Sequence, residues 1–409
     1  MDTTDLVSLE IAPFFLTVLK IAAVTMLYFV SLWSLLIALN FKKPETHYDH
    51  FPRVSLMAYA WQAGNVIERK ILNFLEQGYP REKREIIVYD NSSTDETEQI
   101  CRRYEREGLI KYFRSERHFD SKASVLDKAI ETIATGEILL LTDPDGVCER
   151  DWAKKMVQPF KNSKVGAVVG AIHCGNYFRN LFTRFRAIED EWLTNIVMFG
   201  RYGKIRLSPF NLISGANYAL RKSAWENVGK SHGSTLLEDL EMTGKLYKEN
   251  WIIEAVDANV WQEEVEDVGA YLRQRRRWYR FRLKDLIGEK DKLSRFMALL
   301  PLTLESSTFL AFIPLLYTLI FTSTANLVND WGRLATIFPF IIGNIVMALG
   351  LRKAGKTRLI PYVLPYFIAD GALQVYCFLQ ARLSLVKSKW TKLARGKYYH
   401  VGTPIRTDQ

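Results

Sequence analysis

The chain has 409 residues, of which 48% are apolar and 24% are charged, and its formal net charge is +10. This length allows one large core with additional segments, or two soluble domains. The four cysteines lie far apart without a Cys-x-x-Cys pair, which argues against a disulfide framework and fits a reducing compartment. The basic residues gather beside apolar segments, and neither zinc-ligand spacing nor an RNA-stacking motif is visible, so nucleic acid is not an expected partner.

The chain begins with an apolar stretch over residues 11–39, which is interrupted by a single lysine and followed by Lys42 and Lys43. About 20 mainly apolar residues are enough to cross a bilayer. A cleaved signal peptide is the alternative, but the first residues are acidic rather than basic and no small-residue cleavage site follows. We therefore predict that residues 1–43 form a transmembrane anchor.

The region 44–290 reads as α/β protein, in which short apolar runs alternate with helical patterns. Strands are predicted over residues 54–59, 86–89, 110–114, 138–141 and 165–169, and helices over residues 65–76, 94–107, 121–134 and 151–160. This alternation predicts parallel βαβ units, whose ligands bind beyond the carboxyl ends of the strands. The later part is expected to hold an amphipathic aromatic segment at 178–199, a strand at 217–221, a helix at 238–248 and a long basic helix at 268–287.

Three more apolar stretches follow, over residues 297–322, 334–351 and 359–383. Lys and Arg residues flank them, as is typical of the cytoplasmic side of a membrane. One span before the α/β region and three after it would put the basic tail on the opposite side from that region. Either the first or the third stretch, each with prolines and an acidic residue, is re-entrant or interfacial, or the number of spans differs from this count. The predicted organisation is a cytoplasmic α/β region, transmembrane or interfacial helices over 291–386, and a basic cytoplasmic tail over 387–409.

The first polar motif follows the predicted strand 86–89 and reads Asp90-Asn91-Ser92-Ser93-Thr94-Asp95. Ser, Thr and Asp are good helix caps, so a simple turn is one interpretation. A carboxylate at the end of a strand can also hydrogen-bond a base or ribose. The residues alone leave both interpretations open.

The second motif, Thr142-Asp143-Pro144-Asp145, follows the buried strand 138–141. In an extended segment the proline points away and both carboxylates face one site. Mg²⁺ or Mn²⁺ commonly bridges such carboxylates to a diphosphate. A polar turn is the alternative, but the position at a strand end favours a functional site.

Two later motifs have simple structural explanations beside the functional ones. Residues 236–241 place three acids at a predicted helix start, where the helix dipole favours them, although a general base for an acceptor hydroxyl also needs a carboxylate. Gln274, Arg277 and Trp278 lie on the long basic helix, which suits lipid headgroups. The alternative is that Arg277 neutralises a leaving diphosphate and Trp278 packs against a sugar ring.

Taken in chain order, these four motifs resemble the family 2 glycosyltransferases of the cellulose, chitin and hyaluronan synthase type, with their Gln-x-x-Arg-Trp motif between membrane segments. The resemblance covers nearly the whole chain, including residues 54–59 and 214–217. It implies a GT-A (Rossmann-like) α/β glycosyltransferase domain with α-helical transmembrane segments. It also implies inverting transfer, by one in-line displacement, of a hexosyl or N-acetylhexosaminyl group from a UDP-sugar donor to a growing saccharide at the membrane.

The resemblance also implies roles for individual residues. Donor binding is expected from Asp90, at the base, and from Lys122, Asp143 and Asp145. Asp143 and Asp145 are expected to hold the Mn²⁺ or Mg²⁺ cofactor, and Asp239 is the expected general base. Contacts to the acceptor and the diphosphate are expected from Gln274, Arg277 and Trp278.

The chain departs from this family in three respects. Residues 60–63 read Ala-Trp-Gln-Ala where the family has an Asn-Glu pair, Pro144 separates the paired acids, and the chain is short for a polymer-secreting synthase. A glycolipid-forming enzyme resembling ceramide glucosyltransferase is therefore an alternative. An alternative of another class is a non-catalytic, sugar-binding membrane scaffold, which predicts loss of one or more of the four acids. All four are present.

Overall fold

The structure is a computed structural model, and it describes residues 28–29, 31–44, 47–202, 204–205, 207, 211–230, 238–276 and 331–383. Most of the predicted N-terminal anchor, the whole apolar stretch 297–322 and the basic tail 387–409 lie outside these ranges.

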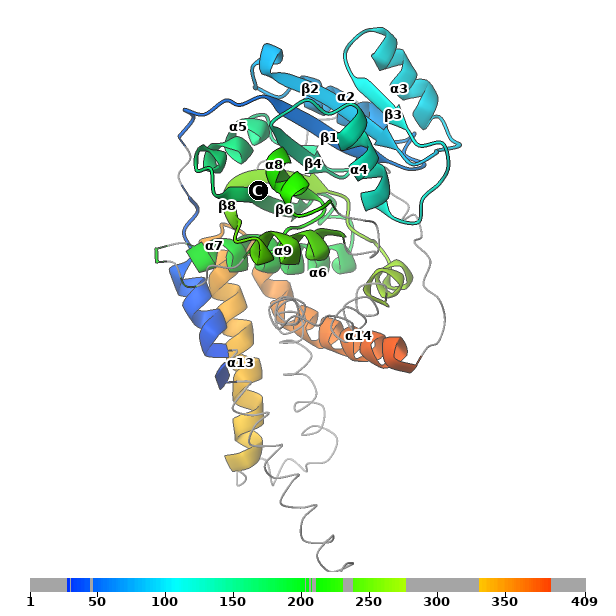
Figure 1. The fold of residues 1–409 in the computed structure, drawn as a ribbon. Helices are drawn as coiled ribbons and strands as arrows, with labels where there is room; N and C mark the ends of the chain where they lie inside the picture. Colours follow the sequence, from blue (N-terminus) through cyan, green and yellow to red (C-terminus); the bar gives the residue numbers. More distant parts are fainter. Residues whose placement is uncertain are drawn as a thin grey trace, which may run out of the picture.

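A mixed eight-stranded sheet forms the centre of the molecule (Figure 1). In chain order its strands are β1 (Val54–Ala60), β2 (Arg84–Asp90), β3 (Lys111–Arg114), β4 (Ile138–Thr142), β5 (Val147–Cys148), β6 (Val165–Cys174), β7 (Asn217–Arg221) and β8 (Ile252–Gln262). Their order across the sheet is β3-β2-β1-β4-β7-β6-β8-β5.

The direction of the strands divides the sheet into two parts. β3, β2, β1 and β4 are parallel, as the alternating pattern predicted. β7 is antiparallel to both of its neighbours, β4 and β6, and β5 is antiparallel to β8. The expectation of parallel units is therefore confirmed for the first four strands, and the sheet is mixed beyond them.

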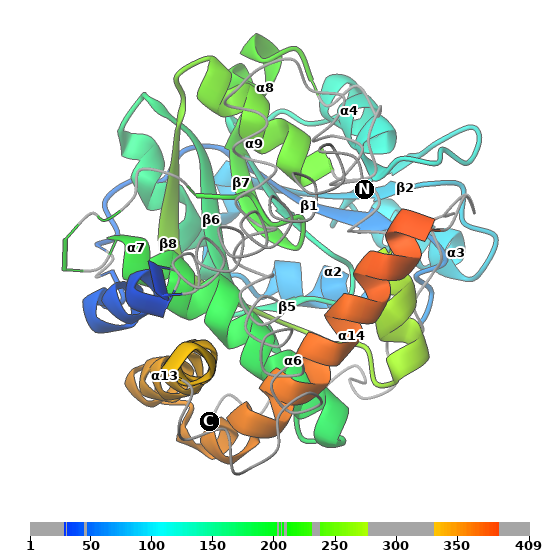
Figure 2. The ribbon, with the colours of Figure 1, turned by 90° about the horizontal axis from the view of Figure 1, so that it is seen from below.

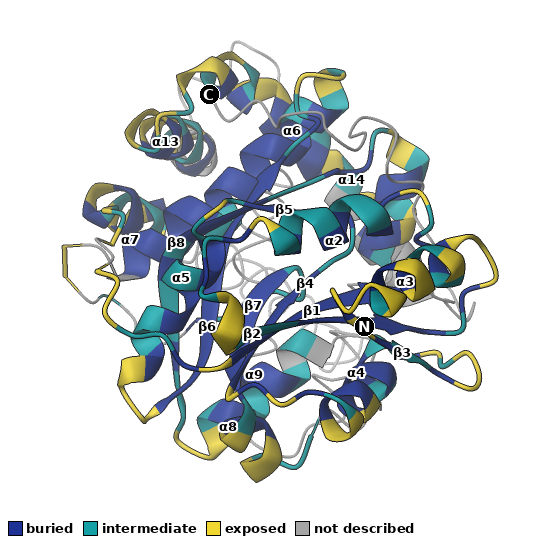
Figure 3. Cartoon of the chain, turned by 90° about the horizontal axis from the view of Figure 1, so that it is seen from above, coloured by how far each residue is buried: buried dark blue, intermediate teal, exposed yellow. Residues whose placement is uncertain are grey.

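Helices cover both faces of the sheet, because alternate side chains of each buried strand point to opposite faces. Leu56 and Ala58 of β1 pack on one side, whereas Met57 and Tyr59 pack on the other. The first face carries α2 (Ile67–Leu75), α3 (Thr97–Arg106) and α5 (Trp152–Val157). The second carries α4 (Lys122–Thr132), α8 (Lys222–Asn227) and α9 (Glu238–Lys248). Figure 3 shows the buried strands between helices whose outer faces are exposed.

A second group of helices packs beside β6. The predicted segment 178–199 is found as α6 (Leu181–Asp190), a π-helical turn (Glu191–Ile196) and α7 (Val197–Tyr202). These pack against a helix over residues 31–40, α13 (Trp331–Lys353), a 3₁₀ turn (Thr357–Tyr362) and α14 (Val363–Leu383). The helix over residues 31–40 and α13 run side by side away from the sheet, while α14 lies across their direction (Figures 1 and 2).

The apolar stretches 334–351 and 359–383 thus correspond to α13 and α14. Within the described ranges, no helix is both long enough and apolar enough to cross a membrane.

Candidate active site

Three of the four predicted motifs lie at one edge of the sheet. Asp90 is the last residue of β2, and Asp143 follows the last residue of β4. β7 begins at the same edge, because it is antiparallel to β4 and its first residue, Asn217, lies opposite Thr142. The loop before β7, which contains Gly215, therefore joins the carboxyl ends of the parallel strands, where ligands bind in α/β sheets.

Lys122 joins three parts of this edge. Its ammonium lies 2.7 Å from Oδ1 of Asp143 and donates a hydrogen bond of 3.2 Å to the Gly215 carbonyl. The amide of Gly215 in turn donates to Oδ2 of Asp239, at 3.1 Å. Asp143, Lys122 and Asp239 come from separate motifs, and this chain of contacts brings them together. The Asp143 side chain is 25% exposed, so it can meet a ligand from solvent.

Asp145 has a different environment from Asp143. The segment after β4 is a turn, closed by a hydrogen bond of 3.2 Å from the Gly146 amide to the Asp143 carbonyl, so the predicted extended geometry is wrong. Proline fixes its own φ angle in a way that suits such a turn. As a result Asp145 is only 1% exposed, whereas Asp143 faces solvent.

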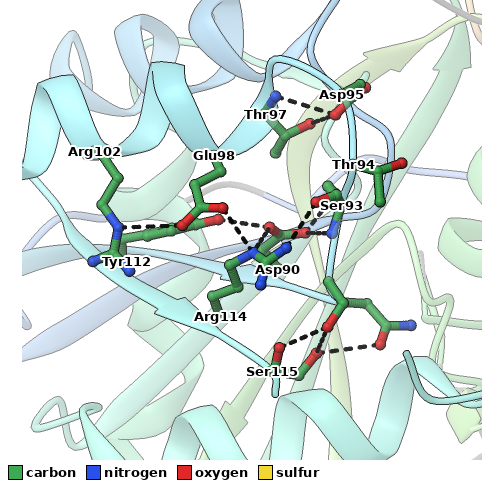
Figure 4. A network of polar contacts seen from close by, with 12 residues as sticks. Asp90, Ser93, Thr94, Asp95, Thr97, Glu98, Arg102, Tyr112, Arg114 and Ser115 are labelled. Carbon is green, nitrogen blue, oxygen red and sulfur yellow. Dashed lines mark hydrogen bonds and ion pairs between the residues drawn. The ribbon is translucent and has the colours of Figure 1, made fainter. Parts of the chain in front are cut away.

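Asp90 lies beneath the surface of the edge, with no exposed area. Its Oδ1 accepts hydrogen bonds from the Ser93 amide (3.1 Å) and hydroxyl (2.5 Å), and its Oδ2 accepts from the Tyr112 hydroxyl at 2.6 Å (Figure 4). The Arg114 guanidinium lies 3.7 Å from Oδ2. Burial, and then the Asp90 carboxylate, raise the pKa of Tyr112 well above its usual value, which keeps this hydroxyl a donor. In this structure Asp90 shapes the turn between β2 and α3, and its contact to a base stays a prediction.

Residues 61 and 62, for which the sequence suggested no role, lie beside that turn. The Gln62 amide donates to the Ser93 hydroxyl at 2.8 Å, and the Gln62 side chain donates to the Thr94 hydroxyl at 2.8 Å. The ring of Trp61 lies 4.9 Å from that of His118, centroid to centroid. The loops after β1 and β2 are therefore joined, and aromatic rings border them.

Gln274 lies on a separate helix, over residues 268–276. Its side chain is only 8% exposed, and its amide oxygen has no hydrogen-bond partner among the described residues. The structure therefore does not bring Gln274 into contact with Lys122 or Asp239. Arg277 and Trp278 lie outside the described residues.

The acids at the sheet edge suit a metal ion that is shared with a ligand. In the part of the chain that the structure describes, no three His, Cys, Asp or Glu side chains are grouped so that they could hold an ion. Mg²⁺, however, is usually bound by one or two carboxylates together with substrate phosphates. Asp143 already binds a cation, the Lys122 ammonium. Asp143 therefore fits an ion completed by a diphosphate, and the part of Asp145 in holding that ion stays a prediction.

Helix α2 supplies neighbours of this site that the motifs did not indicate. The Arg69 side chain donates to the Asp145 carbonyl at 2.8 Å, and Lys70 is completely buried beside Thr142. One signal was present in the sequence. Lys70 follows Ile67 by three residues and precedes Phe74 by four, so it lies on an otherwise apolar helix face.

Comparisons with known proteins point to one family. Residues 57–229 match the family model described as Glycosyl transferase family 2. The chain is 28% identical over 246 residues to the probable glycosyltransferase YdaM of Bacillus subtilis, covering 59% of this chain and 58% of that protein. It is 27% identical over 236 residues to a beta-monoglucosyldiacylglycerol synthase of Nostoc sp., covering 56% of this chain and 48% of that protein.

A third similar protein is the poly-beta-1,6-N-acetyl-D-glucosamine synthase of Staphylococcus aureus, which is 25% identical over 268 residues, or 65% of this chain and 62% of that protein. The chain thus spans roughly half to three fifths of the length of these relatives.

Among solved structures, the mannosyltransferase PcManGT of Pyrobaculum calidifontis, in complex with GDP-Man and Mn²⁺, has a TM-score of 0.54 at 20% identity. The similarity covers 87% of this chain and 98% of that one. Together with the mixed sheet, it confirms the predicted GT-A fold. The sheet edge at which Asp90, Lys122 and Asp143 lie thus falls within residues 57–229, the part of the chain that is similar to the family described as Glycosyl transferase family 2.

Proposed function

We propose that the protein is an inverting, metal-dependent glycosyltransferase of the membrane surface. It transfers a hexosyl or N-acetylhexosaminyl group from a nucleotide-sugar to a growing saccharide. The favoured donor is a UDP-sugar. The observation that carries the proposal is the contact chain from Asp143 through Lys122 and Gly215 to Asp239, at the edge of a family 2 domain. This chain links a cation-binding carboxylate on the donor side to a second carboxylate on the acceptor side.

The proposed reaction divides the work between these two carboxylates. Asp239 accepts the proton of the acceptor hydroxyl, and the Gly215 amide fixes the orientation of its carboxylate. Lys122 exchanges Asp143 for a phosphate oxygen when the donor enters, so it keeps an anionic partner throughout. Mn²⁺ or Mg²⁺ held by Asp143 and Asp145 would supply positive charge to the departing diphosphate. A direct displacement needs no enzyme nucleophile.

Gln274, Arg277 and Trp278 complete this proposal on the acceptor side. An arginine can pair with a diphosphate through two parallel hydrogen bonds, and a tryptophan offers a flat apolar face to a sugar ring. Asp90 is proposed to act at the base through the turn that it organises with Ser93.

The location of the enzyme is part of the same proposal. The helix over residues 31–40 exposes Leu32 and Leu36, and α13 exposes Phe338, Ile341 and Ile345, each by 45% or more. These side chains lie on two adjacent helices that point away from the sheet (Figure 1). We propose that this apolar surface is in contact with the bilayer, with the catalytic domain in the cytoplasm and α14 along the interface.

A glycolipid product is the second candidate. One relative is a beta-monoglucosyldiacylglycerol synthase, and the exposed apolar helices would lie where a lipid acceptor is found. The two candidates share donor and chemistry and differ only in the acceptor.

The test is a transfer assay on the full chain in lipid nanodiscs. Radiolabelled UDP- and GDP-sugars would be supplied with Mn²⁺, Mg²⁺ or EDTA, and the products separated by organic extraction and by size. A large, water-soluble, glycosidase-sensitive product identifies a polysaccharide enzyme, and label in the organic phase identifies a glycolipid enzyme. EDTA-resistant transfer would contradict the metal dependence. Failure to bind any nucleotide-sugar would contradict the enzyme and favour the scaffold alternative.

A further inference from the structure

A fully buried lysine faces the Asp-Pro-Asp turn from helix α2. The Lys70 side chain has no exposed area. Its ammonium lies 3.5 Å from the Thr142 hydroxyl and 3.8 Å from the Cys148 thiol, so it touches the residues that flank the turn on both sides. It also lies 4.7 Å from the centre of the Phe74 ring. This ammonium group is therefore buried beside the residues that precede and follow the turn with the two carboxylates.

Lys70 has no carboxylate partner of its own. It forms no ion pair with any residue in the described ranges, since its contacts are a hydroxyl, a thiol and an aromatic ring. Burying a cation without a paired anion is costly, and replacing it by an apolar side chain of similar volume commonly leaves a protein as stable or more stable. A purely structural role therefore explains this lysine poorly.

The neighbouring residues of α2 already hold the turn in place. Arg69 donates to the Asp145 carbonyl at 2.8 Å, and Asn73 forms hydrogen bonds of 2.9 Å with both the amide and the carbonyl of Cys148. The backbone from Asp145 to Cys148 thus has its own anchors. What Lys70 adds is an amino group without a backbone to hold. Burial lowers the pKa of Lys70, and the charges of Cys148, Asp145 and Asp143 oppose this change by favouring its protonated form.

We propose that Lys70 is an electrostatic positioning residue, the permanent counter-charge of the Asp143–Asp145 site. It weakens the hold of both carboxylates on a divalent cation enough for the ion and the nucleoside diphosphate to leave after transfer. The inference rests on the proposed function, because it assumes that these two acids bind the cation.

An electrostatic role and a structural role predict opposite changes in cation affinity when Lys70 is replaced. Without the buried charge, Coulomb repulsion of the incoming cation is removed, so its affinity should rise about tenfold or more. A residue that only supports the turn would, when replaced, weaken cation binding and lower the melting temperature. Turnover separates the two roles as well, because tighter product binding lowers kcat and lowers the KM for the cation.

The experiment compares Lys70→Met, which has a similar volume and removes the charge, with Lys70→Arg, which keeps the charge. Mn²⁺ binding to the full chain is followed by electron paramagnetic resonance, with Mn²⁺ alone and with UDP present. Lys70→Met is expected to bind Mn²⁺ at least about tenfold more tightly at an unchanged or higher melting temperature, and Lys70→Arg to bind it as wild type does. Weaker or unchanged Mn²⁺ affinity in Lys70→Met would overturn the inference.

An Asp143→Asn variant separates this inference from the proposed function. If wild type binds Mn²⁺ and Asp143→Asn does not, the cation site stands and the Lys70 variants decide the role of the lysine. If wild type binds no Mn²⁺ with or without UDP, the cation site and the Lys70 inference both fail.

Discussion

The Asp239 carboxylate receives a hydrogen bond from a backbone amide, and an asparagine side chain can accept the same bond. Asp239→Asn therefore removes the charge and the basicity while keeping the local structure. We expect transfer to fall by about 10²- to 10⁴-fold, with nucleotide affinity unchanged. Calorimetry with UDP and the radiolabel assay measure the two quantities separately.

The matched control for this substitution is Asp257→Asn. Asp257 lies on β8, and its carboxylate pairs with Lys43 at 2.9 Å. Its activity should equal that of wild type. An active Asp239→Asn variant would remove Asp239 from the role of general base.

Glu191 is a second residue whose environment predicts a measurable effect. Burial alone would raise the pKa of its carboxyl group, but His173, 2.6 Å away, and Lys356, 3.2 Å away, lower this pKa to about 2. A carboxyl group with a lower pKa in the folded state stabilises the fold above its unfolded value of 4.5 and loses that contribution as the pH falls. The contribution is on the order of 3 kcal/mol, and it should disappear between about pH 4.5 and pH 2.

Chemical denaturation of wild type and Glu191→Gln at pH 6 and pH 3 tests this expectation. The variant should be less stable at pH 6, and its stability should fall less than that of wild type between the two values. Glu249→Gln, at an exposed position after α9, is the control and should follow wild type. Parallel curves for Glu191→Gln and wild type would show that Glu191 contributes no pH-dependent stability.

At the scale of elements, the helix over residues 268–276 is held between two others. Arg275 forms an ion pair with Glu189 of α6, and the Tyr271 hydroxyl donates to Asp370 of α14 at 2.7 Å. Arg186 of α6 joins the group through Glu189, which it also contacts, and pairs with Glu264 at 3.2 Å. This buried network fixes the helix that carries Gln274 and leads to the rest of the predicted acceptor motif.

Tyr271→Phe removes one connection of this network without changing the ring. The buried Asp370 loses a donor, which should cost about 1–3 kcal/mol of folding free energy. Because we propose that this helix lies on the acceptor side, we expect the acceptor KM to rise while the nucleotide affinity stays constant. Steady-state kinetics with varied acceptor measure this. Tyr48→Phe, at an exposed tyrosine, is the control. A rise in the donor KM instead would place the helix on the donor side.

The elements also show what can be predicted from sequence. β1 to β4 and helix α9 were predicted because each is either a short buried run or a regular helical pattern. β8 was missed because polar residues interrupt its apolar pattern. In the structure these residues find partners on the neighbouring strand, and Asn259 of β8 forms a hydrogen bond with His173 of β6. The antiparallel direction of β7 has no local signal, since direction depends on where the connecting segment enters the sheet.

The candidate site was predictable to a similar extent. Asp143 and Asp239 were predicted to belong to one site, and the structure joins them through Lys122 and Gly215. The burial of Asp145 could not be predicted, because it depends on the turn that Gly146 closes. Lys70 illustrates the opposite case. A lysine on an apolar helix face is visible in the sequence, but what it faces is visible only in the fold.

At the scale of the whole molecule, the exposed apolar surface of α13 predicts binding to lipid. Ile341 and Ile345 are 45% and 54% exposed, one helical turn apart. Replacing both by serine should weaken co-sedimentation with liposomes by about tenfold. The reason is that the variant removes less apolar side-chain surface from water when it binds lipid. The buried residues of α13, which packs against the π-helical turn (Glu191–Ile196) and α14, are unchanged, so the melting temperature should stay near that of wild type.

Leu109→Ser is the matched control, since Leu109 is 41% exposed and follows α3 on the sheet domain, away from α13. It should leave liposome binding unchanged. Equal binding by the double variant and wild type would argue against α13 as the lipid-contacting surface.

The antiparallel entry of β7 has a consequence for how such a chain can diversify. The chain leaves the sheet after β6, forms α6, the π-helical turn and α7, and returns to the catalytic edge at β7, opposite β4. Strand pairing fixes both ends of this connecting segment between β6 and β7. Its length therefore does not set the distance in space between Asp143 and Gly215. Insertions or deletions there would leave the catalytic geometry intact. We therefore expect relatives with different acceptors to vary most between β6 and β7, and to conserve the spacing at the sheet edge.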